Sequence, residues 1–407
     1  MVASIVIVGG GIAGVSTAAA LRSGGYDGDL TLVDAGEFPY DRPPLSKDYL
    51  AGKQELAALA LQPAEWYDDQ EIRLANRTTV AALRPAEAGV ELSDGTVLPA
   101  DRVVLATGAH AARPPIPGAT SDRVHVLRTA EDADGLRKAL LPGARLLVVG
   151  GGLIGAEAAS TALGLGCEVT LVDPLTPPLA AAVGEETATW LHDLHAERGI
   201  SVLTAGVDAF EETAGGIAAR LNSEHAPRDF DAVLLGVGMR AETTLAEAAG
   251  LEVTGGIVVD AGQTTSNPAV LAVGDPTRRR VDGVLQRPAE HWEAAQHDGT
   301  RAAATILGTP QPEPTAAWFW TDRHGLHVEG VGRMADAGHT VVRGTPGDGP
   351  FSVFAIDDGR VVGAVAVDDT KAVRASRRMI DGRLAVDLDD LADSGTDLRK
   401  LLRAAKG

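Results

Sequence analysis

The feature that most constrains the fold is an internal repeat of a strand, a glycine-rich turn, a helix and a second strand. Residues 5–34 read IVIVGGGIAGVSTAAALRSGGYDGDLTLVD, and residues 146–173 read LLVVGGGLIGAEAASTALGLGCEVTLVD. The first strands of both copies are apolar without polar alternation, which is typical of parallel strands buried on both faces. The repeat therefore predicts two α/β units with helices on both sides of each sheet.

The segments between and after the two copies indicate further boundaries. A Pro-rich stretch at residues 113–118 resembles a crossover between domains, and a PEPTAA stretch before Trp318 marks a second break. Residues 351–356 and 361–367 are joined by Asp-Asp-Gly, which predicts a hairpin in a different kind of domain. We expect a discontinuous first domain at 1–110 and 241–317, an inserted second domain at 111–240, and a smaller α+β domain at 318–407.

Composition excludes several classes of protein. The 407 residues carry a formal net charge of −20, which opposes binding to nucleic acid or to an anionic membrane, although net charge does not exclude a local basic patch. The single cysteine, Cys167, excludes an internal disulfide and a CxxC pair and favours a reducing, cytoplasmic location. The N-terminal apolar segment is far shorter than the ~20 residues of a membrane span. The ten histidines show no metal-ligand spacing, so no metal is expected.

The glycine motif of the first copy predicts a dinucleotide site. Gly9, Gly11 and Gly14 follow a strand and open a helix, where glycines permit a tight turn and a close approach to a pyrophosphate. Asp34 ends the second strand and is placed to accept hydrogen bonds from a ribose. The alternative is an ordinary tight turn between strand and helix, but the complete strand, helix and acid favour a Rossmann-like dinucleotide-binding domain.

The second copy repeats this pattern with Gly150, Gly152, Gly155 and Asp173. Two such sites indicate two dinucleotides, and a flavin with a nicotinamide is the simplest pair. Asp173 favours NADH over NADPH, because a carboxylate repels a 2′-phosphate and residues 168–197 contain no Lys or Arg to offset that. The alternative is a second unit with only a structural role.

Several further motifs give the chain a family resemblance. Residues 38–50 read FPYDRPPLSKDYL, residues 150–157 read GGGLIGAE, and residues 264–275 read TTSNPAVLAVGD. The chain resembles, over essentially its whole length, the FAD- and NADH-dependent ferredoxin reductases that serve cytochromes P450 and Rieske-type oxygenases. The resemblance also includes Ala106-Thr107-Gly108, Gly236 to Gly238, Glu290-His291-Trp292 and the Phe-Trp-Thr-Asp element at residues 319–322.

The resemblance implies that hydride passes from NADH to FAD, and that single electrons then pass to a [2Fe-2S] ferredoxin. The residues that it assigns to FAD are Gly9, Gly11, Gly14, Asp34, Arg42, Lys47, Ala106, Thr107, Gly108, Asp275, Glu290, His291, Trp292 and Trp320. The residues that it assigns to NAD are Gly150, Gly152, Leu153, Ile154, Gly155, Glu157, Asp173 and Gly238.

Lys47 and Glu157 are the expected catalytic pair. The resemblance places Lys47 near the flavin and Glu157 near the nicotinamide, and a Lys47–Glu157 contact is our hypothesis. Taken alone, Glu157 is equally well explained as an acid favoured by the dipole of the helix that it opens. Trp292 and Trp320 have core packing as their ordinary explanation, and shielding of the flavin as the functional one.

Electrons are expected to leave the flavin without a protein cysteine, because the region beside the first site has none and Cys167 reads as a small buried hydrophobe. An acidic ferredoxin would require a local positive face. The candidate docking cations, with a solvated loop as the alternative, are Arg278, Arg279, Arg280, Arg287, Arg301 and Arg323. Pro276, Ala294 and Arg323 depart from the family pattern, and these departures bear on docking and flavin tuning.

Two other functions stay open at this point. One is a reductase of a different acceptor, such as rubredoxin, a quinone or dioxygen. The other is a non-enzymatic flavoprotein whose NADH-bound state regulates a partner, which slow flavin reduction would support. The sequence does not identify the ferredoxin, the terminal oxygenase or the oligomeric state.

Overall fold

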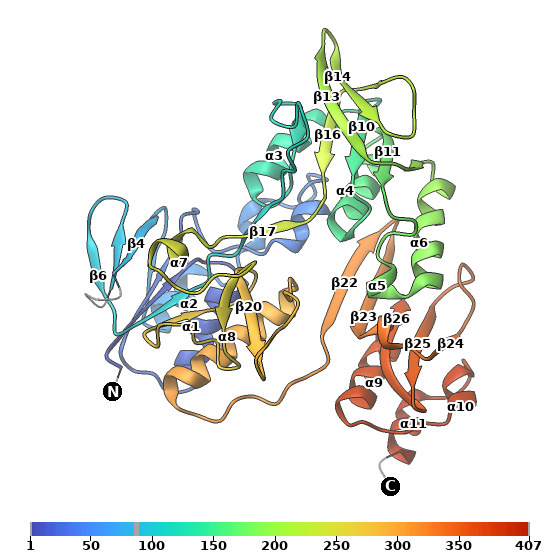
Figure 1. Cartoon of the computed structure of the whole chain (residues 1–407). Coiled ribbons are helices and arrows are strands. Elements are labelled where there is room, and N and C mark those ends of the chain that lie inside the picture. The colour runs from blue at the N-terminus through green and yellow to red at the C-terminus, as the bar shows by residue number, and fades with distance from the viewer. Residues whose placement is uncertain (1, 85–88, 406–407) are drawn as a thin grey trace. The chain divides into compact units, whose positions relative to one another are not determined.

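The computed structural model describes residues 2–84 and 89–405 of the chain (Figure 1). The chain separates into two compact units. Unit 1 consists of Met1–Arg42, Glu55–His110 and Met239–Glu313, and unit 2 of Pro43–Gln54, Ala111–Gly238 and Pro314–Gly407. Each unit is therefore assembled from three separate stretches of sequence.

The core of unit 1 is a five-stranded parallel sheet in the order β19-β7-β1-β2-β3. These strands are β19 (Val270–Ala272), β7 (Arg102–Leu105), β1 (Ser4–Val8), β2 (Asp29–Val33) and β3 (Ile72–Ala75). Ile5 and Ile7 on one face and Val6 and Val8 on the other are all buried, as expected for a central strand. The burial of both faces, predicted from the unbroken apolar run, is confirmed.

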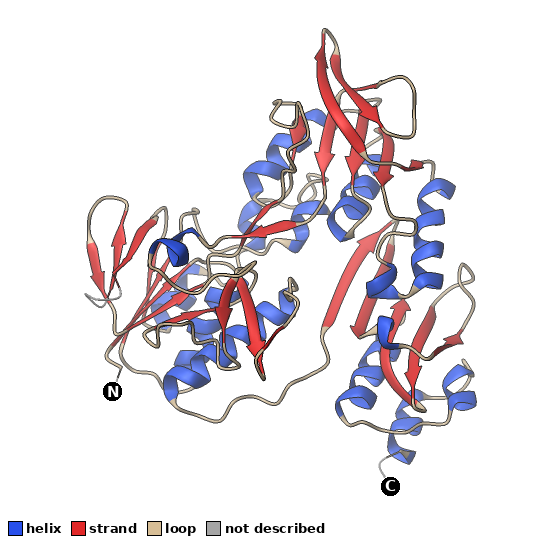
Figure 2. Cartoon of the chain, in the orientation of Figure 1, coloured by secondary structure: helices blue, strands red, loops and turns tan. Residues whose placement is uncertain are grey.

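The two faces of this sheet are covered differently. Helices α1 (Ile12–Ser23) and α8 (Trp292–Leu307) pack together on one face (Figure 2). The other face packs against α7 (Thr244–Ala248) and an antiparallel sheet of β4 (Val80–Arg84), β5 (Gly89–Leu92) and β6 (Val97–Pro99). Smaller elements complete the unit: α2 (Ala64–Asp69), β17 (Met239–Ala241), β18 (Ile257–Val259), β20 (Thr277–Val281) and β21 (Val284–Leu285).

Unit 2 contains a second five-stranded parallel sheet in the order β12-β11-β10-β16-β9. Its strands are β12 (Ser201–Thr204), β11 (Glu168–Asp173), β10 (Arg145–Val149), β16 (Ala232–Leu235) and β9 (Val124–His125). Phe210, Ile217 and Phe230 of an antiparallel sheet pack on one face of it. That sheet consists of β13 (Val207–Thr213), β14 (Gly216–Leu221) and β15 (Arg228–Phe230), and the helices of this part are α3 (Ala130–Ala139), α4 (Leu153–Gly164), α5 (Ala180–Val183) and α6 (Glu185–Glu197).

The C-terminal part of unit 2 is an antiparallel sheet in the order β22-β23-β26-β25-β24. Its strands are β22 (Trp318–Arg323), β23 (Leu326–Gly332), β26 (Arg360–Val367), β25 (Phe351–Asp357) and β24 (His339–Arg343). The predicted hairpin is confirmed as β25 and β26, and Asp358 takes φ 46° in its turn. Helices α9 (Thr370–Asp381), α10 (Leu388–Ala392) and α11 (Leu398–Ala404) bury Val373, Leu391 and Leu402 against one face.

The predicted fold class is confirmed: two Rossmann-like parallel sheets and an α+β C-terminal domain. The boundaries expected for the three domains stay a prediction. Pro43–Gln54, which holds the 3₁₀ turn η1 (Pro43–Ser46), groups with unit 2 although its sequence neighbours group with unit 1. Local sequence carries no signal for that assignment.

Candidate functional sites in the two units

The glycine turn of unit 1 accepts no side chain. A Cβ on Gly9, which has φ +113°, would lie 2.2 Å from the Ala106 carbonyl oxygen. A Cβ on Gly14 would lie 2.0 Å from the Gly9 carbonyl oxygen. Gly11 begins α1 without a side-chain cap, so the positive end of the helix is open to a ligand phosphate. The turn therefore has the form that a dinucleotide pyrophosphate requires.

Two charged residues flank this turn. The Asp34 carboxylate accepts a hydrogen bond from the Gly10 N–H at 3.3 Å, which fixes it at the carboxyl end of β2. The Arg42 guanidinium reaches over the turn, because a Cβ on Gly11 would lie 3.0 Å from its Nη1. Asp34 is thus placed to bind a ribose and Arg42 to bind a phosphate, which fits FAD.

The start of α8 carries three of the residues assigned to FAD. His291 is the N-cap, and burial lowers the pKa of its imidazole while the nearby Asp275 carboxylate partly opposes that effect. The Trp292 indole donates to the Asp41 carboxylate at 2.8 Å and so fixes the segment before Arg42. Glu290, by contrast, is exposed, and its role stays a prediction.

The segment after β7 closes the same side of unit 1. Ala106 supplies the carbonyl that lies under Gly9, and the Thr107 hydroxyl donates to the Glu242 carbonyl at 2.8 Å. Gly108 takes φ +76°, in the region that favours glycine. Ala106 and Gly108 therefore shape the turn through their backbone, and Thr107 fixes it through its hydroxyl.

Helix α8 also holds a buried acid, Asp298, that was not predicted from the sequence. The Asp298 carboxylate accepts from Gln263 Nε2 at 2.9 Å and from the Gly274 N–H at 3.4 Å, and pairs with Arg301 at 3.2 Å. Burial raises the pKa of the Asp298 carboxyl. Asp298 therefore fixes the turn that presents Asp275. The only sequence signal was the Asp298–Arg301 spacing of three residues, which is common on helices.

The second glycine turn lies in unit 2 and repeats the geometry. A Cβ on Gly150, at φ +101°, would lie 2.4 Å from the Gly236 carbonyl oxygen, and one on Gly155 would lie 2.0 Å from the Gly150 carbonyl oxygen. A Cβ on Gly152 would meet nothing within 4 Å. The Asp173 carboxylate accepts from the Gly151 N–H at 2.7 Å and from the Leu175 N–H at 2.8 Å.

The other residues predicted to bind NAD lie around this turn. Gly152 is the N-cap of α4 without a side-chain cap, and Leu153 and Ile154 form the first turn of the helix. Gly238 takes φ +105° beyond β16, and a Cβ there would meet nothing within 4 Å. The open helix end and the fixed Asp173 fit the pyrophosphate and ribose of NAD.

The hypothesis of a Lys47–Glu157 contact is confirmed. Lys47 Nζ lies 3.2 Å from Glu157 Oε1, and also 2.9 Å from Asp322 Oδ2. Lys47 follows η1, Glu157 lies in α4, and Asp322 lies in β22. Three segments far apart in the sequence thus bring one ammonium between two carboxylates.

Glu157 is held by neutral donors as well as by Lys47. The Ser46 hydroxyl donates to Glu157 Oε2 at 2.5 Å, while the Thr321 hydroxyl and the Asp322 N–H donate to Oε1 at 2.7 and 3.1 Å. The side chain is almost completely buried, at 6% exposure. A buried carboxylate needs such partners, because loss of its solvation otherwise costs several kcal/mol. Both of its oxygens are therefore fixed in place.

One face of the β22–β23 hairpin presents a row of aromatic and ionisable side chains. The antiparallel register places Asp322 opposite His327 and Trp320 opposite Glu329. The Trp318 and Trp320 rings stack at 4.9 Å, and Lys47 Nζ lies 5.5 Å from the centre of the Trp320 ring. Asp322 lies in the quoted Phe-Trp-Thr-Asp element but was given no role, and His327 and Glu329 were not singled out.

The expected docking arginines have other roles in the structure. Arg280 forms an ion pair with Glu252 at 2.6 Å, and Arg278 donates to the Thr254 and Gln286 carbonyls. Arg323 requires a correction. It is 3% exposed in β22, and burial lowers the pKa of its guanidinium to about 10. A side chain enclosed in this way is not available to a docking partner. For Arg278, Arg279, Arg280, Arg287 and Arg301, docking stays a prediction.

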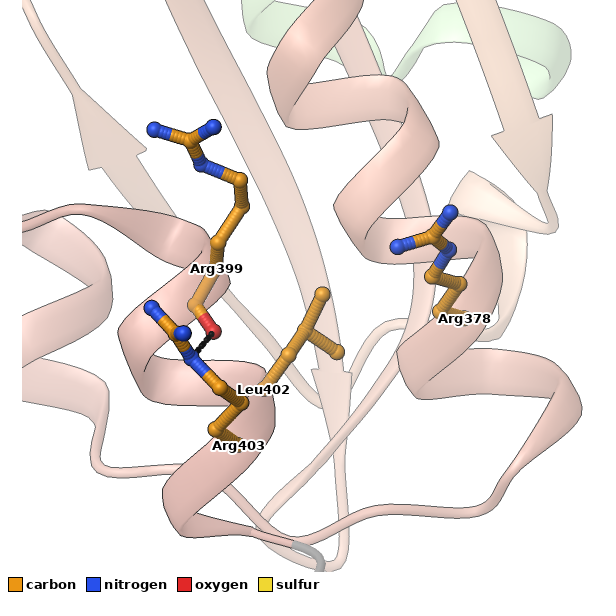
Figure 3. A pocket seen from close by; sticks show the side chains of 4 residues that line it. All are labelled: Arg378, Arg399, Leu402 and Arg403. Carbon is orange, nitrogen blue, oxygen red and sulfur yellow. Dashed lines mark hydrogen bonds between the residues drawn. The ribbon is translucent and has the colours of Figure 1, made fainter.

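Other features of the chain lie outside these sites. A pocket of about 410 Å³ in the C-terminal domain is lined by Arg378, Arg399, Leu402 and Arg403 (Figure 3). Arg399 is already paired with Asp397 at 3.1 Å, and Arg403 Nε donates to the Arg399 carbonyl at 3.3 Å. Cys167 is buried as expected, and burial raises the pKa of its thiol, so it is a poor nucleophile.

Residues 2–84 and 89–405 contain neither a metal-binding cluster nor a membrane-spanning helix. Within these ranges no group of His, Cys, Asp and Glu side chains could hold a metal ion. Over the same ranges, every helix is too short or too polar to cross a bilayer.

Comparison with known proteins agrees with this geometry. Residues 3–299 match the pyridine nucleotide-disulphide oxidoreductase family, and residues 318–402 match the reductase C-terminal family. The chain is 37% identical over 401 residues to the ferredoxin–NAD(+) reductase component of an anthranilate 1,2-dioxygenase system from Burkholderia cepacia, with 98% of each chain covered. It is 34% identical to rhodocoxin reductase from Rhodococcus erythropolis, covering 97% of this chain and 93% of that one.

A solved structure extends the likeness to three dimensions. The putidaredoxin reductase in its covalent complex with putidaredoxin superposes with a TM-score of 0.92 at 33% identity, covering 99% of both chains. The chain belongs to the pyridine nucleotide-disulphide oxidoreductase family. It is an oxidoreductase, and its cofactors are those of the family, FAD and NAD(H).

Proposed function

We propose that this protein is an FAD-dependent NADH:ferredoxin reductase that supplies electrons to an oxygenase system. The observation that carries the proposal is that one chain combines two glycine turns, each with its own acid, and the Lys47–Glu157 contact. The relatives named as ferredoxin–NAD(+) reductases support the choice of acceptor. A cytochrome P450 or a Rieske-type oxygenase is the terminal enzyme that we infer.

When bound, FAD supplies the redox chemistry, because it takes up a hydride from NADH and releases electrons one at a time. In unit 1, Gly9, Gly11 and Gly14 leave room for its pyrophosphate, and Asp34 binds its ribose. Arg42 neutralises phosphate charge at the same turn. These residues bind and orient the cofactor without taking part in bond changes.

In unit 2, Gly150, Gly152 and Gly155 receive the pyrophosphate of NADH, and Asp173 selects its free 2′-hydroxyl. Glu157 and Asp322 hold the Lys47 ammonium, so its positive charge is available to stabilise negative charge that develops beside it. Trp320 lies over Lys47 and limits access of water to it.

The acceptor is inferred to be an outer-sphere, one-electron protein. The one cysteine of the chain is buried, and a dithiol relay would require two. A [2Fe-2S] ferredoxin takes single electrons without any protein thiol. We place the reaction in the cytoplasm, where a free cysteine stays reduced.

A panel of acceptors tests the proposal. The FAD-loaded protein is mixed anaerobically with NADH and, in separate reactions, with a [2Fe-2S] ferredoxin, rubredoxin or a quinone, and oxygen consumption is measured in air. We expect kcat/KM to be highest for the ferredoxin by at least tenfold. A higher value for another acceptor would overturn the ferredoxin assignment, and slow reduction of FAD with every acceptor would favour an NADH-sensing flavoprotein.

A further inference from the structure

The His327 imidazole lies between two carboxylates in unit 2. Its Nδ1 is 2.6 Å from Asp322 Oδ1, and its Nε2 is 3.7 Å from Glu329 Oε2. A neutral imidazole carries no charge, whereas the imidazolium donates to Asp322 and also attracts the Glu329 carboxylate electrostatically. The side chain is 40% exposed and so exchanges protons with solvent. This position suits a residue that changes its charge.

Asp322 connects His327 to the Lys47–Glu157 pair. Asp322 Oδ1 faces His327, while Oδ2 lies 2.9 Å from Lys47 Nζ. Burial raises the pKa of the Asp322 carboxyl, but hydrogen bonds from His327 and Lys47 outweigh burial and hold it below the ordinary value. Asp322 is therefore an anion shared between two cations whenever His327 is protonated.

The other charged groups around the His327 imidazole determine the local balance of positive and negative charge. Arg323 points to the opposite face of β22 and is buried, and Glu329 accepts from the Trp318 indole at 3.0 Å. On the side of β26, the Asp368 carboxylate is exposed and accepts from the His327 backbone N–H. On the face that carries His327, the Lys47 ammonium thus contacts Glu157 and Asp322, and a protonated His327 adds a second positive charge between Asp322 and Glu329.

We propose that His327 is a positioning residue whose protonation determines how tightly Asp322 holds the Lys47 ammonium. With His327 neutral, Asp322 holds Lys47. With His327 protonated, the imidazolium competes for Asp322 and repels the ammonium, which shifts toward Glu157. The inference rests on the proposed function, because it is the family resemblance that assigns Lys47 to FAD and so gives this shift a consequence.

Protonation of His327 should make the reduction potential of bound FAD more positive. A protonated His327 adds positive charge near Lys47 and weakens the hold of Asp322 on the ammonium, and both effects favour the reduced, more negative state of bound FAD. The reduction potential of FAD should therefore be more positive at low pH in the wild type than in a variant without the imidazole. At high pH the FAD reduction potentials of the wild type and the variant should be equal.

The experiment compares the FAD-loaded wild type with His327→Gln from pH 5.5 to 8.5. His339→Gln is the matched control, because His339 is an exposed histidine on β24, at the opposite edge of the same sheet. The FAD reduction potential is measured against redox dyes, and the rate of FAD reduction by NADH is measured anaerobically. His327→Asn, whose amide can still donate to Asp322, is the second variant.

We expect His327→Gln and His327→Asn to lower the FAD reduction potential and to slow reduction by at least about threefold at pH 5.5, with no change at pH 8.5, while His339→Gln matches the wild type. Asp322→Asn should also remove the pH dependence, since it breaks the connection to Lys47. An equal decrease of the FAD reduction potential and of the reduction rate at every pH would indicate a merely structural role and overturn the inference. A pH profile of the variants identical to that of the wild type would also overturn it. Wild-type FAD that NADH does not reduce would instead overturn the proposed function.

Discussion

At the residue scale, Glu157 is the acceptor on which the site of unit 2 depends. Four donors reach its two oxygens: Ser46 Oγ, Thr321 Oγ1, the Asp322 N–H and Lys47 Nζ. Since the carboxylate is buried, its charge is balanced by these groups and not by water. Replacing Glu157 by a neutral residue therefore removes the charge of this carboxylate and changes the position of Lys47.

Glu157→Gln should therefore impair reduction more than folding. The amide keeps the size of the side chain but removes the charge that draws Lys47 from Asp322, so we expect the rate of FAD reduction by NADH to fall about 10- to 100-fold, or about 1.4 to 2.8 kcal/mol of activation free energy. Anaerobic stopped-flow absorbance gives the rate. The control is Glu168→Gln, an exposed glutamate at the start of β11, which should leave the rate unchanged. A Glu157→Gln rate within twofold of the wild type would contradict the assigned role.

Asp173→Asn tests the choice of nicotinamide. The Gly151 and Leu175 N–H groups donate to different oxygens of Asp173, so Asn, with one acceptor oxygen, retains one of these two hydrogen bonds and no longer repels a 2′-phosphate. We expect kcat/KM for NADH to fall about tenfold and the preference for NADH over NADPH to narrow by a similar factor. Steady-state kinetics with both nucleotides measures this. An unchanged preference would mean that Asp173 does not recognise the ribose.

Residues that interact locally could be predicted, and residues brought together by strand register could not. The glycines, Asp34 and Asp173 belong to continuous motifs, and Lys47–Glu157 came from the family resemblance. Asp322, His327 and Glu329 meet because β22 and β23 pair in one register, and a shift of one residue would turn them to the other face. Arg323 was mistaken for a surface cation for the same reason, since alternation along β22 turns it inward.

At the scale of elements, the two glycine turns determine how closely the helix packs on the strand in each strand–turn–helix unit. Gly155→Ala places a methyl group 2.0 Å from the Gly150 carbonyl oxygen, so helix and strand must separate. We expect the free energy of unfolding to fall by about 2 kcal/mol or more. Gly152→Ala, where a Cβ meets nothing within 4 Å, should fold normally, and any loss of NADH affinity there reports crowding of the ligand. Urea unfolding and nucleotide titration separate the two effects; equal stability of the two variants would contradict this account.

A histidine pair connects α6 to the β22–β23 turn. His324 Nε2 lies 2.8 Å from His195 Nδ1, and the His324 N–H donates to Ser160 Oγ at 2.7 Å. Burial, with Arg323 nearby, lowers the pKa of His195 to about 3, and burial, with Arg198 nearby, lowers the pKa of His324 to about 4. Both rings are therefore neutral in the folded protein at neutral pH.

This pair predicts a loss of stability in acid. The unfolded chain binds a proton on each histidine near pH 6.5, whereas the folded chain does not until the pH approaches 4 and then 3. The free energy of unfolding should thus decrease as pH falls below 6.5, by about 1.4 kcal/mol per pH unit for buried His195. His195→Gln should flatten the curve between pH 6.5 and 4.5 in urea unfolding, and His339→Gln should not. If His195→Gln keeps the wild-type dependence of the unfolding free energy on pH, the contribution of His195 to acid instability would be ruled out.

The regular elements were more predictable than the accessory ones. Both parallel sheets followed from apolar strands and glycine turns, and the β25–β26 hairpin followed from its Asp-Asp-Gly turn. The antiparallel sheet of β13, β14 and β15 was not predicted. β13 is mostly half-buried or exposed, and its strands acquire their hydrophobic face only when Phe210 and Ile217 pack on the parallel sheet.

At the scale of the whole molecule, the net charge of −20 is the main constraint on a partner. An acidic ferredoxin can dock only where positive charge is concentrated, and Arg280 is already neutralised by Glu252 while Arg323 is buried. Exposed Arg287 is among the candidates that remain. Arg287→Glu should lower kcat/KM for ferredoxin about threefold or more at low salt and leave FAD reduction by NADH unchanged. A steady-state salt series measures both, and no change in kcat/KM would exclude Arg287 from docking.

In the proposed reaction, electrons pass from NADH through this flavoprotein to a [2Fe-2S] ferredoxin. The most direct measurement mixes the FAD-loaded protein, reduced anaerobically with one equivalent of NADH, with oxidised ferredoxin in a stopped-flow instrument while flavin and cluster absorbance are followed together. We predict cluster reduction within seconds at low salt, slowing as salt rises. Flavin that stays reduced beside an oxidised cluster would contradict the ferredoxin assignment, and flavin that NADH does not reduce would contradict the account as a whole.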